Sequence, residues 1–322
     1  MISQLRKDVE QLAVPGGRMP GTPAHIAARE YIIARAIQEG LEGYANDSFE
    51  LPYSEGEIRL TNVIGRLPGL RPELPPVLIA AHYDTCGTTP GADDNASAVA
   101  IALSAVEPLR KARLDRSVLF AFFDAEEPPH FLKPTMGSTY FYEHQRREEI
   151  HCAVVLDLVG HDLPAPTLEN ALIVIGMESD PGLEGVVRAC DPSPGLSTLV
   201  TLNRYIGDMS DHHIFRISKR PYLFLTCAQW EHFHLPTDTP EKLNYEKMAH
   251  IAAYTVRATI GVASATLEGP FEGYDTTETE LYFVRKYAKP IADALGNPLQ
   301  SRTDLESMVS LLASEGGLLT GR

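Results

Sequence analysis

Five segments of this 322-residue chain carry side chains that bind divalent metals, and each lies where an apolar run ends or a loop begins. The first is VLIAAHYDT, in which His82 and Asp84 are separated by one residue. In an extended chain this spacing puts both side chains on one face, so the carboxylate can hold the imidazole of a metal-bound histidine and fix its tautomer. A purely structural role for the pair is the competing interpretation.

The second segment, PGADDNASAVA, presents Asp93, Asp94 and Asn95 directly before a helix of small residues. A carboxylate at this place, or a metal that it holds, lies close to the free backbone donors of the helix start. The same residue types are also common helix N-caps. This segment alone therefore leaves both interpretations open.

The third and fourth segments place acidic residues at the end of an apolar run or inside one. Glu126 and Glu127 follow VLFAFFDA; because adjacent side chains point to different sides, one can bind a metal while the other takes a proton from water as general base. A solvated loop end is the alternative. Asp157 lies inside AVVLDLVG, where an isolated carboxylate costs several kcal/mol unless it binds a metal or forms a buried salt bridge.

The fifth segment, made of SDHHIF and WEHFHLPTDTPEKL, is rich in histidine and aspartate. Its candidates are His212, His213, His232, His234, Asp211 and Asp238. Each histidine taken singly is explained as well by a structural role. Together, however, the five segments supply the oxygen and nitrogen donors that zinc accepts.

The elements that must position these residues are short apolar strands separated by helices. Strands are predicted over 77–81, 118–123, 153–159, 171–176 and 221–225, and helices over 24–39, 97–109 and 245–260. Unbroken apolarity is typical of strands covered on both faces. We therefore predict an α/β fold, a three-layer α/β/α sandwich with a mainly parallel central sheet, with the ligands at the carboxyl edge of that sheet.

Composition narrows the function classes. Lys and Arg sum to 28 against 43 Asp and Glu, a net charge of −15, which disfavours nucleic-acid and anionic-membrane partners. No apolar stretch reaches the ~20 residues of a membrane-spanning helix. The charged N-terminus is unlike a signal peptide, so a cytoplasmic location is expected. The cysteines lack CxxC spacing and are expected to be buried free thiols: Cys86, Cys152, Cys190 and Cys227.

Two domain regions are predicted. Residues 1–268 form the catalytic domain, and residues 269–322 form a helical C-terminal extension packed on the same domain, with two helical patterns broken at 296–298. An oligomer contact through this extension is one of its possible roles.

With these residues in order, the sequence resembles the M28 family of zinc aminopeptidases, which are co-catalytic metallopeptidases. The resemblance runs from Arg18 to Ile260. It includes His-x-Asp, Gly-Ala-x-Asp-Asn, the adjacent Glu pair, Leu-Asp-x-Val-Gly, Ser-Asp-His and His-x-Pro-x-Asp-Thr in the family's order. A zinc-exopeptidase-like fold and hydrolysis of N-terminal residues from peptide substrates are what this resemblance implies.

The resemblance also implies a role for each matching residue. Two Zn²⁺ ions are expected, with a single ion as the alternative. The implied roles are Glu126 as general base, Asp94 as the bridging ligand, Glu127 and His234 as ligands of one zinc, His82 and Asp157 as ligands of the other, Asp84 as the residue that orients His82, and Asp211 as an aspartate near the site.

The sequence departs from the family pattern at three places. Leu235 follows His234 where the family commonly has Thr, the Pro-rich loop 128–136 is longer than the minimal connection, and the C-terminal extension lies outside the resemblance. We predict that the Pro-rich loop forms one wall of the substrate pocket, with Phe131 and Phe233 as pocket residues.

Two other functions remain open. A glutaminyl-cyclase-like enzyme with one zinc shares the FFDAEE and LDLVG stretches, although such enzymes usually place Trp where this chain has Phe233. A catalytically inactive binding protein of the same fold would be expected to have broken ligands, and none is broken here.

Overall fold

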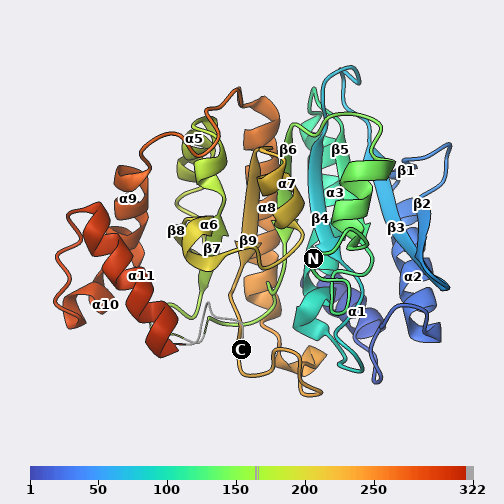
Figure 1. The fold of residues 1–322 in the computed structure, drawn as a ribbon, viewed down its shortest axis with the longest axis horizontal. Coiled ribbons are helices and arrows are strands. Elements are labelled where there is room, and N and C mark those ends of the chain that lie inside the picture. The colour runs from blue at the N-terminus through green and yellow to red at the C-terminus, as the bar shows by residue number, and fades with distance from the viewer. Residues whose placement is uncertain (164, 166, 317–322) are drawn as a thin grey trace.

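A nine-stranded sheet runs through the part of the chain that the computed structural model describes, residues 1–163, 165 and 167–316 (Figure 1). Its strands are β1 (Glu42–Gly43), β2 (Glu50–Glu55), β3 (Ile58–Leu67), β4 (Val77–His82), β5 (Val118–Phe123), β6 (Cys152–Leu156), β7 (Ala171–Ile175), β8 (Ser197–Thr201) and β9 (Tyr222–Thr226). The spatial order is β1-β3-β5-β4-β6-β9-β7-β8, with β2 paired to β3.

The four central strands β5, β4, β6 and β9 are parallel neighbours, as expected from their unbroken apolarity. Every residue of these strands is buried. The outer pairs β1–β3, β2–β3, β3–β5 and β7–β9 are antiparallel, so the sheet is parallel at its centre and mixed at its edges. The carboxyl ends of four adjacent strands therefore meet at one edge of the sheet.

Helices cover both faces of this sheet. They are α1 (Ile2–Leu12), α2 (Pro23–Gln38), α3 (Ala98–Ala112), α4 (Gly137–Tyr140), α5 (Gly182–Ala189), α6 (Asn203–Ile206), α7 (His212–Ile217), α8 (Tyr245–Ser264), α9 (Thr277–Tyr287), α10 (Lys289–Ala294) and α11 (Arg302–Gly316). One apolar core joins one sheet face to α1, α2, α3, α5 and α8, and a second joins the other face to α7 and the C-terminal helices. The predicted three-layer α/β/α architecture is confirmed.

Helix α2 shows how the local sequence sets an element. The Thr22 side chain accepts a hydrogen bond from the His25 amide at 3.2 Å, and Pro23 occupies the first turn, where its missing N–H costs nothing. Gly40, with a φ of 74°, follows the helix end in the left-handed region that glycine adopts readily. Helix α8 begins in a similar way, with the Asn244 side chain accepting from the Lys247 amide at 3.0 Å.

The helices that follow residue 269 lie beyond β8, at the opposite edge of the sheet from β1 and β2 (Figure 1). The helices are interrupted between α10 and α11, where the sequence predicts an interruption at 296–298. Residues 317–322 of the predicted extension lie outside the described residues. Among the described helices, none combines the length and the apolar character needed to cross a membrane.

Candidate metal centre

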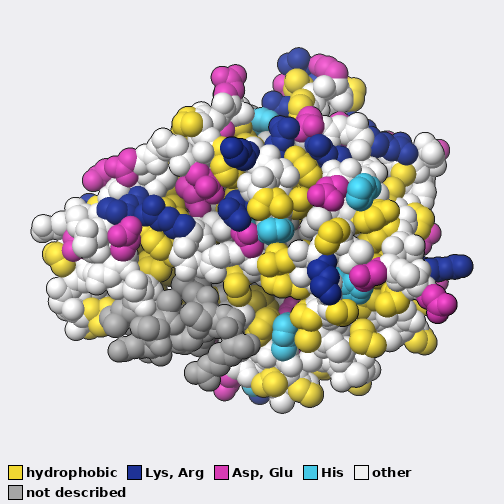
Figure 2. Space-filling view, in the orientation of Figure 1, with side chains coloured by type: hydrophobic (Ala, Val, Ile, Leu, Met, Phe, Trp, Pro, Cys, Tyr) yellow, Lys and Arg dark blue, Asp and Glu magenta, His cyan; other side chains and the backbone are white. Residues whose placement is uncertain are grey.

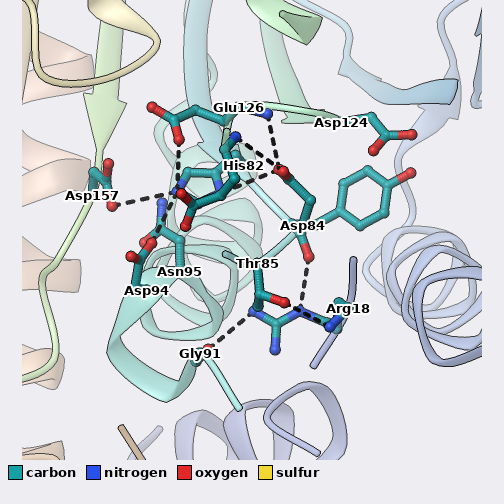
Figure 3. Close-up of polar contacts among 12 residues, drawn as sticks. Arg18, His82, Asp84, Thr85, Gly91, Asp94, Asn95, Asp124, Glu126 and Asp157 are labelled. Carbon is teal, nitrogen blue, oxygen red and sulfur yellow. Dashed lines mark hydrogen bonds and ion pairs between the residues drawn. The ribbon is translucent and has the colours of Figure 1, made fainter. Parts of the chain in front are cut away.

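The five segments meet at the carboxyl edge of the central parallel strands. His82 is the last residue of β4, the Glu126–Glu127 pair follows β5, Asp157 follows β6, and His234 lies in the loop after β9. Parallel pairing brings these strand ends to one place. Figure 3 shows the carboxylates of Asp94, Glu126 and Asp157 around the His82 side chain.

Two groups of candidate ligand atoms share Asp94. The His82 Nε2 atom lies 3.2 Å from Asp94 Oδ1 and 3.6 Å from Asp157 Oδ1. On the other side, the His234 Nε2 atom lies 3.2 Å from Asp94 Oδ2 and 3.1 Å from Glu127 Oε2. One carboxylate thus faces both histidines, one oxygen to each.

The side chains of His82, Asp94, Glu126, Glu127, Asp157 and His234 form one cluster, and its charges are those of a cation site. Four buried carboxylates belong to it, from Asp94, Glu126, Glu127 and Asp157. Among the described residues, their ion pairs come from His82 and His234, and from no lysine or arginine. Burial, together with the neighbouring Asp94 carboxylate, raises the pKa of Glu127 to about 8. So much confined negative charge requires a positive partner.

The donor atoms themselves fit zinc. Both ring nitrogens of His82, Asp157 Oδ1 and Glu127 Oε1 are buried without a hydrogen-bond partner in the described structure. Buried polar atoms are rarely left unpaired, because each costs about 1–3 kcal/mol. Imidazole nitrogens and carboxylate oxygens are ligands that Zn²⁺ takes. We conclude that these residues fit zinc.

The Asp84 carboxylate fixes the geometry of the Glu pair. Its two oxygens accept hydrogen bonds from the backbone amides of Glu126 and Glu127, each at 3.0 Å. Its Oδ1 also lies 3.4 Å from His82 Nδ1. Ala125, with a φ of 55°, turns the chain at the strand end just before the pair. Asp84 therefore holds together two segments that are far apart in the sequence.

The loop that carries Asp94 is held by a second set of buried groups. The amides of Asp93 and Asp94 donate to the two oxygens of Asp238, at 2.8 and 3.1 Å. The Asp93 carboxylate faces away from the ligand cluster: it accepts from the Gly160 amide and meets His161 Nδ1, both at 2.6 Å. Neither aspartate caps a helix with its side chain, and the backbone of Ala92–Ser97 is kinked at Asp94 and Asn95, whose φ and ψ angles are non-helical.

Arg18 positions the chain on the other side of that loop (Figure 3). Its side chain is fully buried and donates to the carbonyls of Leu12, Tyr83, Pro90 and Gly91 at 2.7–3.0 Å. Burial lowers its pKa to about 10, which keeps the guanidinium charged at neutral pH. The family resemblance begins at this residue, but no pattern in the sequence assigns it this role.

Replacing Arg18 with methionine is expected to lower the free energy of unfolding by about 3 kcal/mol or more, because each buried carbonyl left without a donor costs about 1–3 kcal/mol. Urea denaturation measures the change. Arg59→Met is the matched control, since this arginine is exposed and its replacement should change stability by no more than about 0.5 kcal/mol. A loss below about 1 kcal/mol at Arg18 would contradict the role described here.

Three of the candidate histidines do not join the cluster. His212 Nε2 lies 2.9 Å from Asn203 Oδ1, His213 Nδ1 lies 2.7 Å from Asp208 Oδ2, and His232 Nδ1 lies 2.9 Å from the Thr237 hydroxyl. Each is accounted for by a local hydrogen bond. Sequence spacing could not separate them from His234, because only the fold shows which histidine reaches the strand ends.

Asp211 is buried beside the site with both carboxylate oxygens unpaired in the described structure. Burial raises its pKa to about 7, although His82 favours the charged form. Its charge thus interacts with His82 and Asp157 of the cluster.

A cavity of about 350 Å³ opens next to the ligands. Its walls include carboxylates of the cluster and a larger apolar set: Pro128, Phe131, Leu158, Ile206, Met209, Phe224, Ala228 and Phe233. The two residues predicted for a pocket, Phe131 and Phe233, both line it. Over the face shown in Figure 2, acidic and basic side chains are mixed, without a continuous basic surface.

Cys86 departs from the sequence expectation. Cys152, Cys190 and Cys227 are buried free thiols as predicted, but Cys86 is only half-buried. It lies in the loop after β4, next to the ligand cluster. A lone cysteine two residues after Asp84 carries no spacing signal, so sequence reasoning could not find this placement.

A comparison with known families decides what kind of protein carries this site. The sequence profile of peptidase family M28 matches residues 62–259, which is more than half of the chain. The chain belongs to peptidase family M28. The matched segment contains every residue of the ligand cluster.

Relatives of this M28 protein match only part of their own length. The uncharacterized protein YfbL of Escherichia coli is 28% identical over an alignment 207 residues long, which covers 55% of this chain and 64% of YfbL. Aminopeptidase YwaD of Bacillus subtilis is 32% identical over 87 residues, 26% of this chain and 18% of YwaD. The chain therefore spans less than two thirds of the length of these relatives.

Solved structures confirm the fold of the M28 protein. The LapA aminopeptidase of Legionella pneumophila aligns with a TM-score of 0.66 and 18% identity, covering 83% of this chain and 71% of LapA. A glutaminyl cyclase from Fimbriiglobus ruber aligns with a TM-score of 0.64 and 20% identity, covering 81% of this chain and 95% of that chain. A Zn-dependent exopeptidase from Parabacteroides distasonis has a TM-score of 0.64 and 17% identity, over 81% and 97% of the two chains.

Proposed function

We propose that this M28 protein is a zinc aminopeptidase that binds two zinc ions and removes N-terminal residues from peptides. The observation that carries the proposal is the shared Asp94 carboxylate, with one oxygen 3.2 Å from His82 Nε2 and the other 3.2 Å from His234 Nε2. A single-ion site would need only one of these two groups. His82, Asp94 and Asp157 would hold one zinc, and Asp94, Glu127 and His234 the other.

Zinc bound here would act as a Lewis acid that polarises the peptide carbonyl and makes water more acidic. The protein supplies the proton transfers. Glu126 lines the cavity, and its Oε2 atom is 3.9 Å from His82 Nε2, farther than the oxygens of the proposed ligands. From there it would accept a proton from the attacking water and donate it to the leaving amine.

The carboxylates that border the cavity favour a substrate with a free N-terminus. A cavity bordered by several carboxylates attracts an α-ammonium group and disfavours a second negative charge. This preference suits an exopeptidase that begins at the amino end. The apolar remainder of the cavity would receive the first side chain of the substrate.

Zinc analysis together with a substrate panel tests the function. Aminoacyl-p-nitroanilides and a peptide with N-terminal Gln should be offered to the zinc-loaded protein. We expect two zinc ions per chain and release of p-nitroaniline. Conversion of the Gln peptide to a cyclised product, with one zinc and no release of p-nitroaniline, would favour the cyclase, and the absence of zinc would exclude both functions.

The Pro-rich loop 128–136 is proposed to shape specificity. Pro128 and Phe131 line the cavity directly after the Glu pair. The loop is tied to the sheet, because His130 is buried and its Nδ1 lies 2.7 Å from Glu55 Oε2 of β2. Its prolines restrict the backbone, which suits a fixed wall better than a mobile lid.

Phe131→Ala is expected to change discrimination between large and small N-terminal residues by about 1–3 kcal/mol, the effect of losing one apolar pocket contact. Ratios of kcat/KM for leucyl and alanyl p-nitroanilides measure it. Leu132→Ala is the control, since this neighbour is exposed and does not line the cavity. Unchanged ratios in the Phe131 variant would place the loop outside the substrate pocket.

A further inference from the structure

Cys86 lies within reach of the proposed ligands on the His234 side. Its Sγ atom, a carboxylate oxygen of Glu127 and a ring nitrogen of His234 all lie within 4.8 Å of one another. The Nε2 atom of His234 is 3.2 Å from Asp94 Oδ2. Three donors therefore lie together, a thiol, an imidazole and a carboxylate, and the Asp94 carboxylate lies beside the imidazole.

A second observation is that one of these donor residues has a buried oxygen without a hydrogen-bond partner. Glu127 is 3% exposed, and its Oε1 atom has no hydrogen-bond partner in the described structure. A buried carboxylate oxygen without a donor costs about 1–3 kcal/mol, more when it is charged. A cation placed among the thiol, the imidazole and the carboxylates would satisfy it.

The backbone holds the thiol near this point. Cys86 accepts hydrogen bonds at its carbonyl oxygen from the Thr89 amide at 3.3 Å and from the Thr89 hydroxyl at 2.8 Å. Gly87, between them, has a φ of 55°, a conformation that glycine adopts without strain. The turn thus fixes the Cys86 backbone beside Glu127 and His234.

We propose that Cys86 is a further zinc ligand, which binds as a thiolate beside Asp94, Glu127 and His234. When it binds, the S–H bond breaks, a sulfur–zinc bond forms and the proton leaves to solvent. Zinc accepts sulfur, nitrogen and oxygen donors together, and catalytic zinc can become five-coordinate, so a fourth protein ligand would still leave a position for water or substrate. A thiolate ligand makes the site prefer thiophilic metals such as Zn²⁺ and Cd²⁺ over Mg²⁺ and Mn²⁺.

This inference rests on the proposed zinc site but not on peptidase activity, so its test reads metal and thiol directly. Co²⁺ and Cd²⁺ are added to the full-length protein, and ultraviolet absorption is followed for a thiolate-to-metal charge-transfer band. In parallel, iodoacetamide labelling of each cysteine is measured by mass spectrometry with and without Zn²⁺. Zinc affinity is measured by competition with a chelator.

Cys86→Ser is the test variant, and Cys190→Ser, a change at a buried cysteine in the segment after α5, is the control. We expect the charge-transfer band in the unmodified protein and in the Cys190 variant but not in the Cys86 variant. Zn²⁺ should slow labelling of Cys86 at least tenfold, and Cys86→Ser should weaken zinc binding at least tenfold.

These measurements distinguish a failure of the Cys86 proposal from a failure of the proposed zinc site. If the protein binds zinc but shows no charge-transfer band and equal zinc affinity in both variants, Cys86 is not a ligand and the metal centre stands. If the unmodified protein binds no zinc at all, the metal centre and the Cys86 inference fall together.

Discussion

Replacing Glu126 with glutamine is expected to lower kcat by about 10²–10⁴-fold while the zinc content stays unchanged. The amide has nearly the same shape as the carboxylate but cannot accept a proton from water. Because Glu126 Oε2 is farther from His82 Nε2 than the oxygens of Asp94 and Asp157, the substitution should leave the ligand groups intact. Steady-state kinetics and elemental analysis of the purified variant measure the two quantities.

Glu57→Gln is the control for this experiment, because Glu57 is exposed in the turn between β2 and β3. It should leave both kcat and zinc content unchanged. Loss of zinc from the Glu126 variant would make Glu126 a ligand and not the base. A kcat close to that of the unmodified protein would remove Glu126 from the proton transfers altogether.

The central sheet could be predicted because its strands are buried on both faces. Such strands consist of unbroken apolar runs, and the bounds of β4, β5, β7 and β9 lie within one residue of the predicted ranges. Strand β6 ends at Leu156, three residues before the predicted end, so Asp157 follows the strand instead of lying inside it. The sequence does not predict β1, β2, β3 or β8, and for β2 and β8 the reason is the opposite one. In both strands buried residues alternate with more accessible ones, and β2 carries Pro52, so neither forms an apolar run.

The site could be predicted as a set of residue types, but not as a geometry. Adjacent strand ends and acidic residues indicated a shared location, and the family resemblance assigned the roles. The backbone contacts of Asp84 and Asp238 depend on loops that meet only in the fold, at separations of 42 to 145 residues. No local pattern encodes such contacts, and the same is true of the position of Cys86.

Asp94→Ala is expected to abolish high-affinity zinc binding and, with it, activity. Asp94 lies 3.2 Å from a ring nitrogen of each histidine, so its removal would take a ligand from each proposed ion at once. Loss of a residue that only hydrogen-bonds a metal ligand lowers metal affinity about 10–100-fold. Loss of the shared ligand should exceed that range, as measured by chelator competition and by the number of zinc ions retained after dialysis.

Asp93→Ala provides the matched control, because the neighbouring aspartate is just as buried but faces Gly160 and His161 instead of the ligands. Its removal leaves the Gly160 amide without an acceptor, so stability should fall by about 1–3 kcal/mol while the folded variant still binds zinc. Comparing the two variants thus separates the effect on zinc binding from the effect on the stability of the loop. The reverse pattern, with zinc lost from the Asp93 variant and kept in the Asp94 variant, would overturn the ligand assignment on which the two-zinc proposal depends.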